Sequence, residues 1–156
     1  METKLGEVIG LAMAAQAATE RVEKLTDDRQ LAAALKKMRK EAEQAEKDGT
    51  AVAASINGKK GKILVEARSV KTKGAAMMKI YLERGSDDLD GFEFLTMAEA
   101  GEVGHWSVLQ ELNKQARHPG VRKLVSTHLP IQKRHLKEAM AASLKLAAKE
   151  DANAEA

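Results

Sequence analysis

A helical stripe in the second half of the chain carries a carboxylate and an imidazole at the spacing of metal ligands. From Leu95 to Leu109 the positions three and four residues apart are apolar except for Glu102, which therefore faces a core. His105 follows Glu102 by three residues and lies about one turn away on the same side of the helix. An inward Glu-x-x-His offers two ligands to one metal ion. A buried structural pair explains the same pattern, and that alternative stays open.

A second set of polar side chains follows between Pro119 and Lys149. The apolar stripe of this stretch is interrupted by His128 and His135, and Gln132 precedes His135 by three residues. Pro119 cannot continue the preceding helix but fits the first turn of a new one, so the chain is expected to reverse there. We expect His128 to lie one or two turns from the other polar side chains of this stretch.

The reversal places these two sets at one level of an antiparallel pair of helices. The polar side chains expected at that level are Glu102, His105, Gln132 and His135. Each buried polar group costs several kcal/mol unless it is paired, so ordinary packing does not favour such a collection. Two imidazoles beside carboxylate or amide oxygens suit a first-row divalent metal.

The composition predicts an all-α protein with one domain over residues 1–156. Hydrophobic residues make up 44% and aromatic residues 3% of the chain, and Ala and Leu dominate the apolar share. With no cysteine, a metal has only oxygen and imidazole ligands available. No apolar run has the length of a membrane span, and the net charge of +3 does not call for nucleic acid or a membrane. We therefore expect a cytoplasmic protein.

Helical periodicity divides the chain into two hairpins, residues 3–48 and 89–149, joined by a crossover, residues 49–88. Asp48 and Gly49 are expected to end the second helix. Within the crossover, the stretch from Ile63 to Leu82 permits an additional helix on the outside of the bundle. Pro130 is expected to kink the last helix, because the apolar phase continues across it.

The crossover is locally basic. Its basic residues are Lys59, Lys60, Lys62, Arg68, Lys71, Lys73 and Lys79. They could bind phosphate or an acidic partner, or they could form the solvated face of a connecting helix. No aromatic residues are interleaved with them to stack bases, which speaks against nucleic acid.

Two helical hairpins with a long crossover and inward Glu-x-x-His ligands resemble the ferritin-like superfamily, most of all its short, stress-associated bacterial members. The resemblance implies a four-helix bundle with an additional crossover helix, and a metal site built from all four bundle helices. The matching motifs are Glu102-x-x-His105, Gln132-x-x-His135 and Glu41-x-x-Gln44, and Gln16 and Glu7 are the nearest polar residues on the first helix. Glu41-x-x-Gln44 is also explained by a solvated, charged helix face.

The resemblance implies a metal-binding protein with a redox or stress-related role. A mononuclear or vestigial site is the alternative to a full centre with two metal ions. Its expected metal is iron or manganese, with zinc as an alternative, and its expected ligands are Glu102, His105, His135, His128, Gln132 and Glu41. Whether it turns over a substrate is left open, and a homodimer is expected. The alternative function is a non-catalytic helical interaction module that binds an acidic partner through the basic crossover.

Overall fold

The computed structural model describes residues 1–151, 153 and 154, and within them the secondary structure is entirely helical. The helices are α1 (Glu2–Glu23), α2 (Arg29–Ser55), α3 (Lys60–Tyr81), α4 (Asp88–Ala116) and α5 (Pro119–Ala147). None of the described helices is long and apolar enough to cross a membrane. The predicted all-α fold with a crossover helix is confirmed at this level.

Local signals in the sequence fix where the helices begin. The Asp28 side chain accepts hydrogen bonds from the backbone amides of Gln30 and Leu31, which caps α2. Asp87 and Asp90 form a reciprocal capping box at the start of α4. These caps satisfy amide groups that would otherwise have no partner in the first helical turn.

The turn between α4 and α5 is closed by side chains. The Asn113 amide group donates to the carbonyl of His118 and accepts from the amide of His118. Arg117 between them adopts a left-handed conformation with φ of 55°, and Pro119 occupies the first turn of α5. The chain therefore reverses where the sequence predicted.

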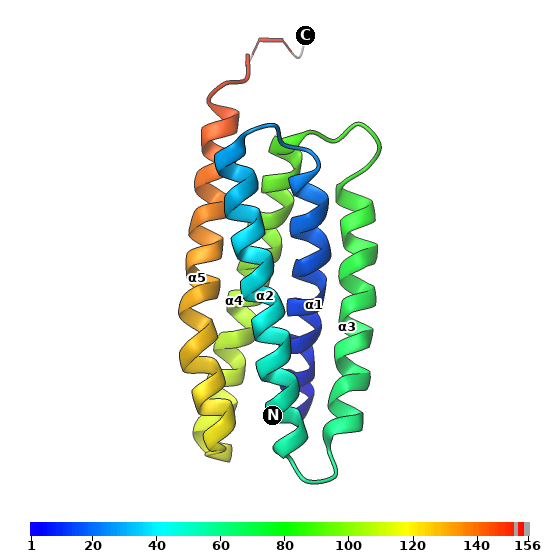
Figure 1. Ribbon diagram of the computed structural model, residues 1–156, viewed down its shortest axis with the longest axis vertical. Helices are drawn as coiled ribbons and strands as arrows, with labels where there is room; N and C mark the ends of the chain where they lie inside the picture. The colour runs from blue at the N-terminus through cyan, green and yellow to red at the C-terminus, as the bar shows by residue number, and fades with distance from the viewer. Residues whose placement is uncertain (152, 155–156) are drawn as a thin grey trace.

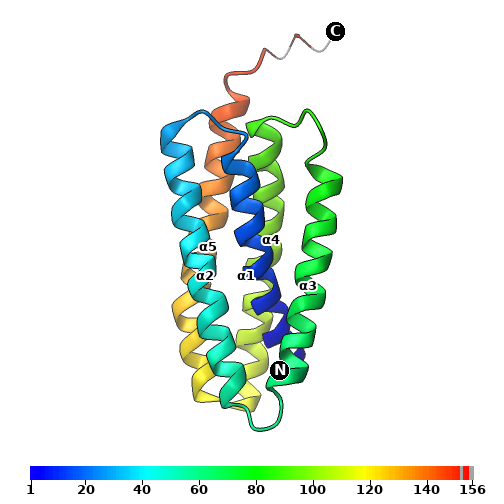
Figure 2. The same cartoon turned by 45° about the vertical axis from the view of Figure 1, so that its right-hand side comes forward.

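Helices α1, α2, α4 and α5 form a bundle, and α3 lies outside it against α1 (Figures 1 and 2). Helices α1 and α5 run in one direction, whereas α2 and α4 run in the opposite direction (Figure 1). Helix α3 runs the length of the bundle on its outside and connects the end of α2 to the start of α4, which run in the same direction. Every neighbouring pair in the bundle is therefore antiparallel.

Two glycines of α1 allow α3 to approach closely. A Cβ atom on Gly6 would lie 2.7 Å from the carbonyl oxygen of Ile63, and one on Gly10 would overlap the carbonyl of Ala67. Ile63 and Ala67 are buried at this contact. The crossover helix is thus held against α1 by backbone proximity as well as by apolar packing.

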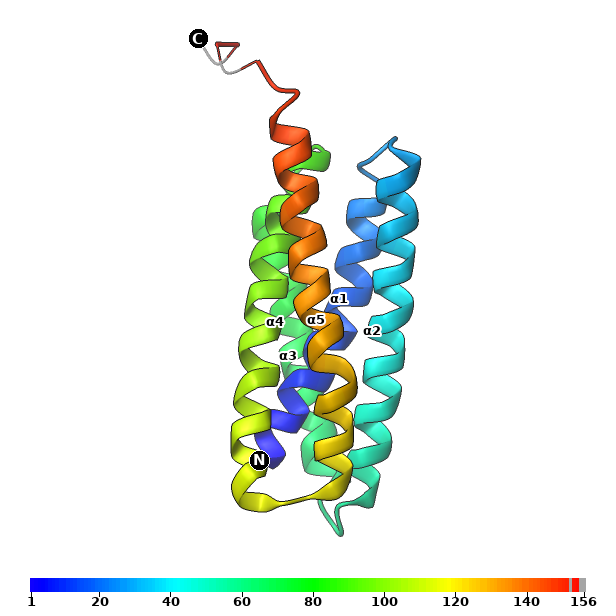
Figure 3. The same cartoon turned by 90° about the vertical axis from the view of Figure 1, so that its left-hand side faces the viewer.

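A polar layer divides the core into two apolar clusters. One cluster surrounds Trp106 and the other surrounds Phe92. On α4 the break falls between Leu95 and Trp106, and on α5 it falls between Leu129 and Ala139. Figure 3 shows α4 and α5, the two helices on which this break falls, side by side and joined by their turn.

The structure differs from the sequence prediction at the end of α2. Asp48 and Gly49 do not end α2, which continues to Ser55, so that prediction was wrong. Gly49 is buried in the helix, and a Cβ atom there would lie 2.7 Å from Ile9, so the glycine serves packing and not chain reversal. Helix α5 continues through Pro130 as one helix. Residues 152, 155 and 156 of the polar C-terminal tail lie outside the described residues.

Candidate functional site

The polar layer is built from three helices of the bundle. Its members are Glu41 of α2, Glu99 and Glu102 of α4, and Gln132 and His135 of α5. Below, these five residues are called the acidic cluster. Glu99, Glu102 and His135 are only 1%, 3% and 2% exposed. Such burial is uncommon for ionisable side chains and requires partners within the protein.

His135 is the centre of the acidic cluster. Its Nε2 atom lies 2.7 Å from Glu41 Oε2, and its Nδ1 atom lies 3.1 Å from Gln132 Oε1 and 3.6 Å from Glu99 Oε2. Burial favours the neutral imidazole, but Glu99 and then Glu41 outweigh it and raise the pKa of His135. The imidazolium is therefore the form that these carboxylates stabilise.

Glu102 has a different environment. Its Oε2 atom accepts a hydrogen bond of 2.7 Å from Gln132 Nε2. Burial, and next the charge of the neighbouring Glu99, raise the pKa of Glu102 well above the ordinary value for a carboxyl group. Both effects favour the protonated form of Glu102.

Glu99 is the least satisfied member of the acidic cluster. Among the described residues, no donor hydrogen-bonds to its Oε2 atom, because the 3.6 Å contact with His135 is an ion-pair distance and too long for a hydrogen bond. A buried carboxylate oxygen without a hydrogen bond is costly to the folded state. The acidic cluster therefore has unused capacity to bind a cation or a donor.

Glu41 closes the acidic cluster on its outer side. Its Oε1 atom lies 2.6 Å from the guanidinium of Arg134, while Oε2 contacts His135. Burial acts against the Glu41 anion, but Arg134 and His135 outweigh it and lower the pKa of Glu41. Arg134 also lies 3.2 Å from Glu138, so its guanidinium joins carboxylates of α2 and α5 at the edge of the acidic cluster.

His105 lies outside the acidic cluster. Its Nδ1 atom is 2.8 Å from Glu7 Oε2 and 3.3 Å from Lys4 Nζ, on the side of α4 that faces α1. A step of three residues along an α-helix rotates the side-chain direction by about 300°, which is about 60° less than a full turn. The step from Glu102 to His105 therefore turns the side chain toward α1. The same step in the other direction brings Glu99 toward His135.

His128 also lies apart. Its Nε2 atom is 2.9 Å from Asp48 Oδ2, and its ring lies against Trp106 with the ring centroids 5.6 Å apart. Of the predicted ligands, the structure therefore brings together Glu102, Gln132, His135 and Glu41, and separates His105 and His128 from them. On α1, Gln16 bonds to Glu46 at 2.5 Å, not to the acidic cluster.

Within the described residues, no three His, Asp or Glu side chains are arranged so that they could hold a metal ion as they stand. In the acidic cluster, the two nitrogens of His135 hydrogen-bond to Glu41 and Gln132, and Glu102 is bonded to Gln132. A metal ion would have to replace protons that now maintain these contacts.

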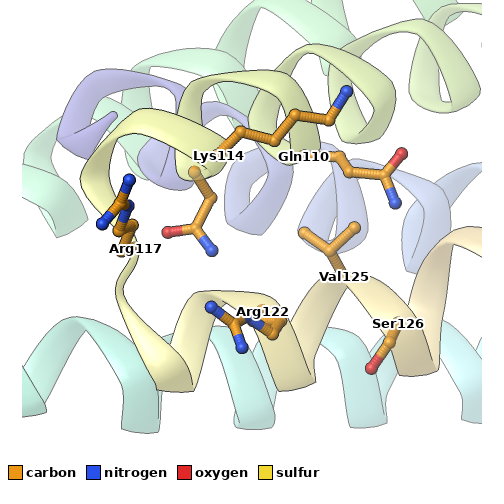
Figure 4. Close-up of a pocket in the computed structure, with 7 residues that line it drawn as sticks. Gln110, Lys114, Arg117, Arg122, Val125 and Ser126 are labelled. Atoms are coloured by element: carbon orange, nitrogen blue, oxygen red, sulfur yellow. The ribbon is translucent and has the colours of Figure 1, made fainter.

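Two hollows differ in their relation to the acidic cluster. A cavity of about 210 Å³ between α1, α3 and α4 is lined mainly by apolar side chains together with Glu99, Glu102 and His105. A larger, open pocket of about 510 Å³ lies by the α4–α5 turn and is lined by Lys114, Arg117 and Arg122 among others (Figure 4). Only the first hollow reaches the acidic cluster.

No known family model, curated protein or solved structure matches this chain. Its function is therefore inferred from the acidic cluster and from the helices α2, α4 and α5 that position it.

Proposed function

We propose that the acidic cluster binds a divalent first-row metal ion, with iron or manganese as the expected metals and zinc as an alternative. The observation that carries this proposal is the pair of buried carboxylates on α4, of which Glu99 keeps an oxygen atom without a hydrogen bond. Carboxylates buried without enough donors favour a cation, and imidazole and carboxylate together suit manganese, iron and zinc.

Charge balance supports the proposal. A divalent ion that displaces the protons of Glu102 and His135 adds two positive charges and removes two, so the net charge of the buried layer stays the same. The ion would be bound by Glu99, Glu102 and His135, with Glu41 and Gln132 within reach of small side-chain rotations. Arg134 would remain with Glu41 and hold it in place.

The arrangement of the helices is in keeping with a ferritin-like origin. In the ferritin-like superfamily, two antiparallel hairpins are joined by a long crossover, and facing helices carry the ligands in the core. Here α3 occupies the crossover, and α2, α4 and α5 carry the acidic cluster. Gln132 stands where the ferritin-like superfamily has a carboxylate. This favours one metal ion over two, since fewer negative charges are available to offset a second ion.

Calorimetric titration of chelator-treated protein with Mn(II) at pH 7, in buffers of different ionisation enthalpy, tests the proposal. We expect one ion per chain and the release of about two protons. Glu102→Gln should weaken binding by about tenfold or more and reduce the proton release to about one. Absence of saturable binding, or binding without proton release, would refute it.

His105→Ala is the matched control for His135→Ala in this titration. His105 contacts Glu7 and Lys4 outside the acidic cluster, so its removal should leave metal affinity nearly unchanged. His135→Ala should weaken binding by about tenfold or more. Equal losses in the two variants would show that His105 is a ligand and that the proposed ligand set is wrong.

A second candidate function is binding of an acidic partner through α3. Only Ile63 and Ala67 of this helix are fully buried, and its outer face exposes basic side chains together with Val65 and Ile80. A partner held by these charges should dissociate steeply with added salt, whereas metal binding in the buried layer should respond little. Salt dependence therefore separates the two functions.

We also propose a homodimer. Large apolar side chains remain exposed on three helices: Val65, Met77, Ile80 and Tyr81 on α3, Met97, Val108 and Leu112 on α4, and Met140 and Leu144 on α5. Exposed apolar area of this kind favours association when it is contiguous. Sedimentation at micromolar concentration should show a dimer, and a monomer alone would contradict the expectation.

A further inference from the structure

The cavity between α1, α3 and α4 combines an apolar wall with a charged inner end. Leu11 and Ala14 of α1 and Met77 of α3 form part of its apolar wall. Glu99 and Glu102 line the cavity from α4. Those two glutamates are almost fully buried, whereas Met77 and Met97 are partly exposed. The carboxyl groups therefore mark the inner end of the cavity, and the methionines mark its mouth.

We propose that this cavity binds a small organic amine, with its apolar body along α1 and α3 and its ammonium group at Glu99 and Glu102. The inference does not depend on metal binding, because it concerns the metal-free protein. The two ligands would use the same carboxyl groups and should exclude each other.

The size of the cavity fits such a ligand. Its volume is about 210 Å³, and an apolar protein cavity of about 150 Å³ is sufficient to admit benzene. A benzene ring with one methylene and one ammonium group is therefore of suitable size. Apolar contacts alone would bind neutral and charged molecules of this shape equally well.

The carboxyl groups provide the preference for a cation. Glu99 and Glu102 are desolvated when the protein folds, so an incoming ammonium does not have to strip water from them. Glu99 Oε2 has no hydrogen-bond donor within the described residues. An ammonium group brings three donors and a positive charge to this end of the cavity.

The charges at the outer end are already balanced. His105 lies on the cavity wall, and Glu7 lies against both His105 and Lys4. Burial acts against the Glu7 anion, but Lys4 and His105 outweigh it and lower the pKa of Glu7. Within the described residues, Glu99 is the carboxyl group of the cavity that keeps an oxygen atom without a hydrogen-bond donor, and this orients the ammonium group inward.

The test is calorimetric and NMR titration of chelator-treated protein with benzylamine, benzyl alcohol and benzoate at pH 7. We expect saturable one-to-one binding of benzylamine, at least about tenfold weaker binding of benzyl alcohol and no binding of benzoate. Glu99→Gln should abolish the preference for the amine over the alcohol. Equal affinities for amine and alcohol, or no binding of benzylamine, would overturn the proposal.

Two glycines of α4 provide a matched pair of variants. A Cβ atom on Gly101 or on Gly104 meets no other atom within 4 Å, but only Gly101 lines the cavity. Gly101→Leu should fill the mouth and weaken benzylamine binding by about tenfold or more, whereas Gly104→Leu should not change it. Both substitutions improve helix propensity, so folding should be preserved. If Gly101→Leu binds benzylamine as wild type does, the ligand lies elsewhere and the proposal fails.

Failure of this proposal and failure of the metal proposal can be distinguished. Amine binding is measured with a chelator present, and metal binding is measured without amine. If both ligands bind, Mn(II) should displace benzylamine from the wild-type protein. Simultaneous binding of both would overturn the placement of the ammonium at Glu99 and Glu102.

Discussion

At the scale of single residues, Glu102 should leave a signature in the pH dependence of stability. An unfolded glutamate loses its proton near pH 4.3, whereas folded Glu102 retains its proton to a considerably higher pH. Between these two values the folded state binds more protons, so its stability falls as pH rises, by at most about 1.4 kcal/mol per pH unit. Chemical denaturation of metal-free protein at pH 5 and pH 6 should show this loss.

Glu102→Gln removes the titrating group while it keeps a hydrogen-bonding partner for Gln132. The variant should therefore lose less stability than the wild type between pH 5 and pH 6. Glu111→Gln is a suitable control, because the Glu111 side chain is 69% exposed and should leave the profile unchanged. A Glu102→Gln profile parallel to that of the wild type would contradict a raised pKa for Glu102.

The histidines of α4 and α5 should differ strongly in their contribution to stability. Removal of His135 leaves Glu99 without its cation and takes a partner from Glu41, which costs about 3–5 kcal/mol for a buried ion pair. His105 is partly exposed in its pair with Glu7, so His105→Ala should cost about 1 kcal/mol or less. Urea unfolding of both variants at pH 6 provides the comparison, and similar losses would contradict the assigned surroundings.

The stability that His135 provides should also depend on pH. Because its pKa is raised in the folded state, its contribution is complete below pH about 6.5 and is lost as pH rises through the folded pKa. The difference between wild type and His135→Ala should therefore narrow in alkaline solution. A constant difference would indicate that the lost contribution comes from packing alone.

Sequence periodicity located part of the acidic cluster. Glu102 and His135 interrupt apolar stripes, and the predicted reversal near Pro119 brought Gln132 and His135 to the level of Glu102. The reversal put His135 opposite Glu102, whereas in the structure Gln132 hydrogen-bonds to Glu102. Periodicity did not separate the two neighbours of Glu102, because Glu99 and His105 are both three residues away on opposite sides. Their orientation depends on which helix lies on each side of α4, and that is a property of the assembled bundle.

At the scale of helices, the contact between α1 and α3 should be sensitive to a single methyl group. Gly10→Ala favours the helical conformation by up to about 1 kcal/mol, but its Cβ atom would overlap the Ala67 carbonyl. Overlap with backbone cannot be relieved by a side-chain rotation, so we expect net destabilisation by about 1–3 kcal/mol. Thermal unfolding should show this loss.

Gly104→Ala is the control for Gly10→Ala. Its Cβ atom meets nothing within 4 Å, so the gain in helix propensity should remain and stabilise the protein by about 0.5–1 kcal/mol. Opposite signs for the two substitutions would support the close approach of α3 to α1. Stabilisation by both would contradict it.

The end of α2 shows why local signals can mislead. Asp and Gly together are typical of a turn, yet α2 runs through Asp48 and Gly49 to Ser55. Asp48 bonds to His128, and Gly49 gives room to Ile9. Contacts with α1 and α5 outweigh the local preference, and these contacts could not be seen from the residues on either side of Gly49.

At the scale of the whole molecule, metal binding should appear as added stability, because an ion bound only by the folded bundle stabilises it by mass action. At a free metal concentration of about 100 times the dissociation constant the gain is about 2.7 kcal/mol, which corresponds to a rise of about 5–10 °C in Tm for a chain of this size. Fe(II) under anaerobic conditions, Mn(II) and Zn(II) should each be compared with a chelator control.

The rise in Tm should be much smaller in Glu102→Gln and in His135→Ala but retained in His105→Ala and His128→Ala, whose side chains lie with Glu7 and with Asp48. Combining Glu102→Gln with His135→Ala should remove less metal-dependent stability than the sum of the two single losses, since both side chains belong to one shared site. The same variants measured with a chelator give the loss of stability of the metal-free protein, which is compared separately. An unchanged rise in all four variants would mean that metal binds elsewhere on the chain, and the bundle would then stand as a fold without the proposed function.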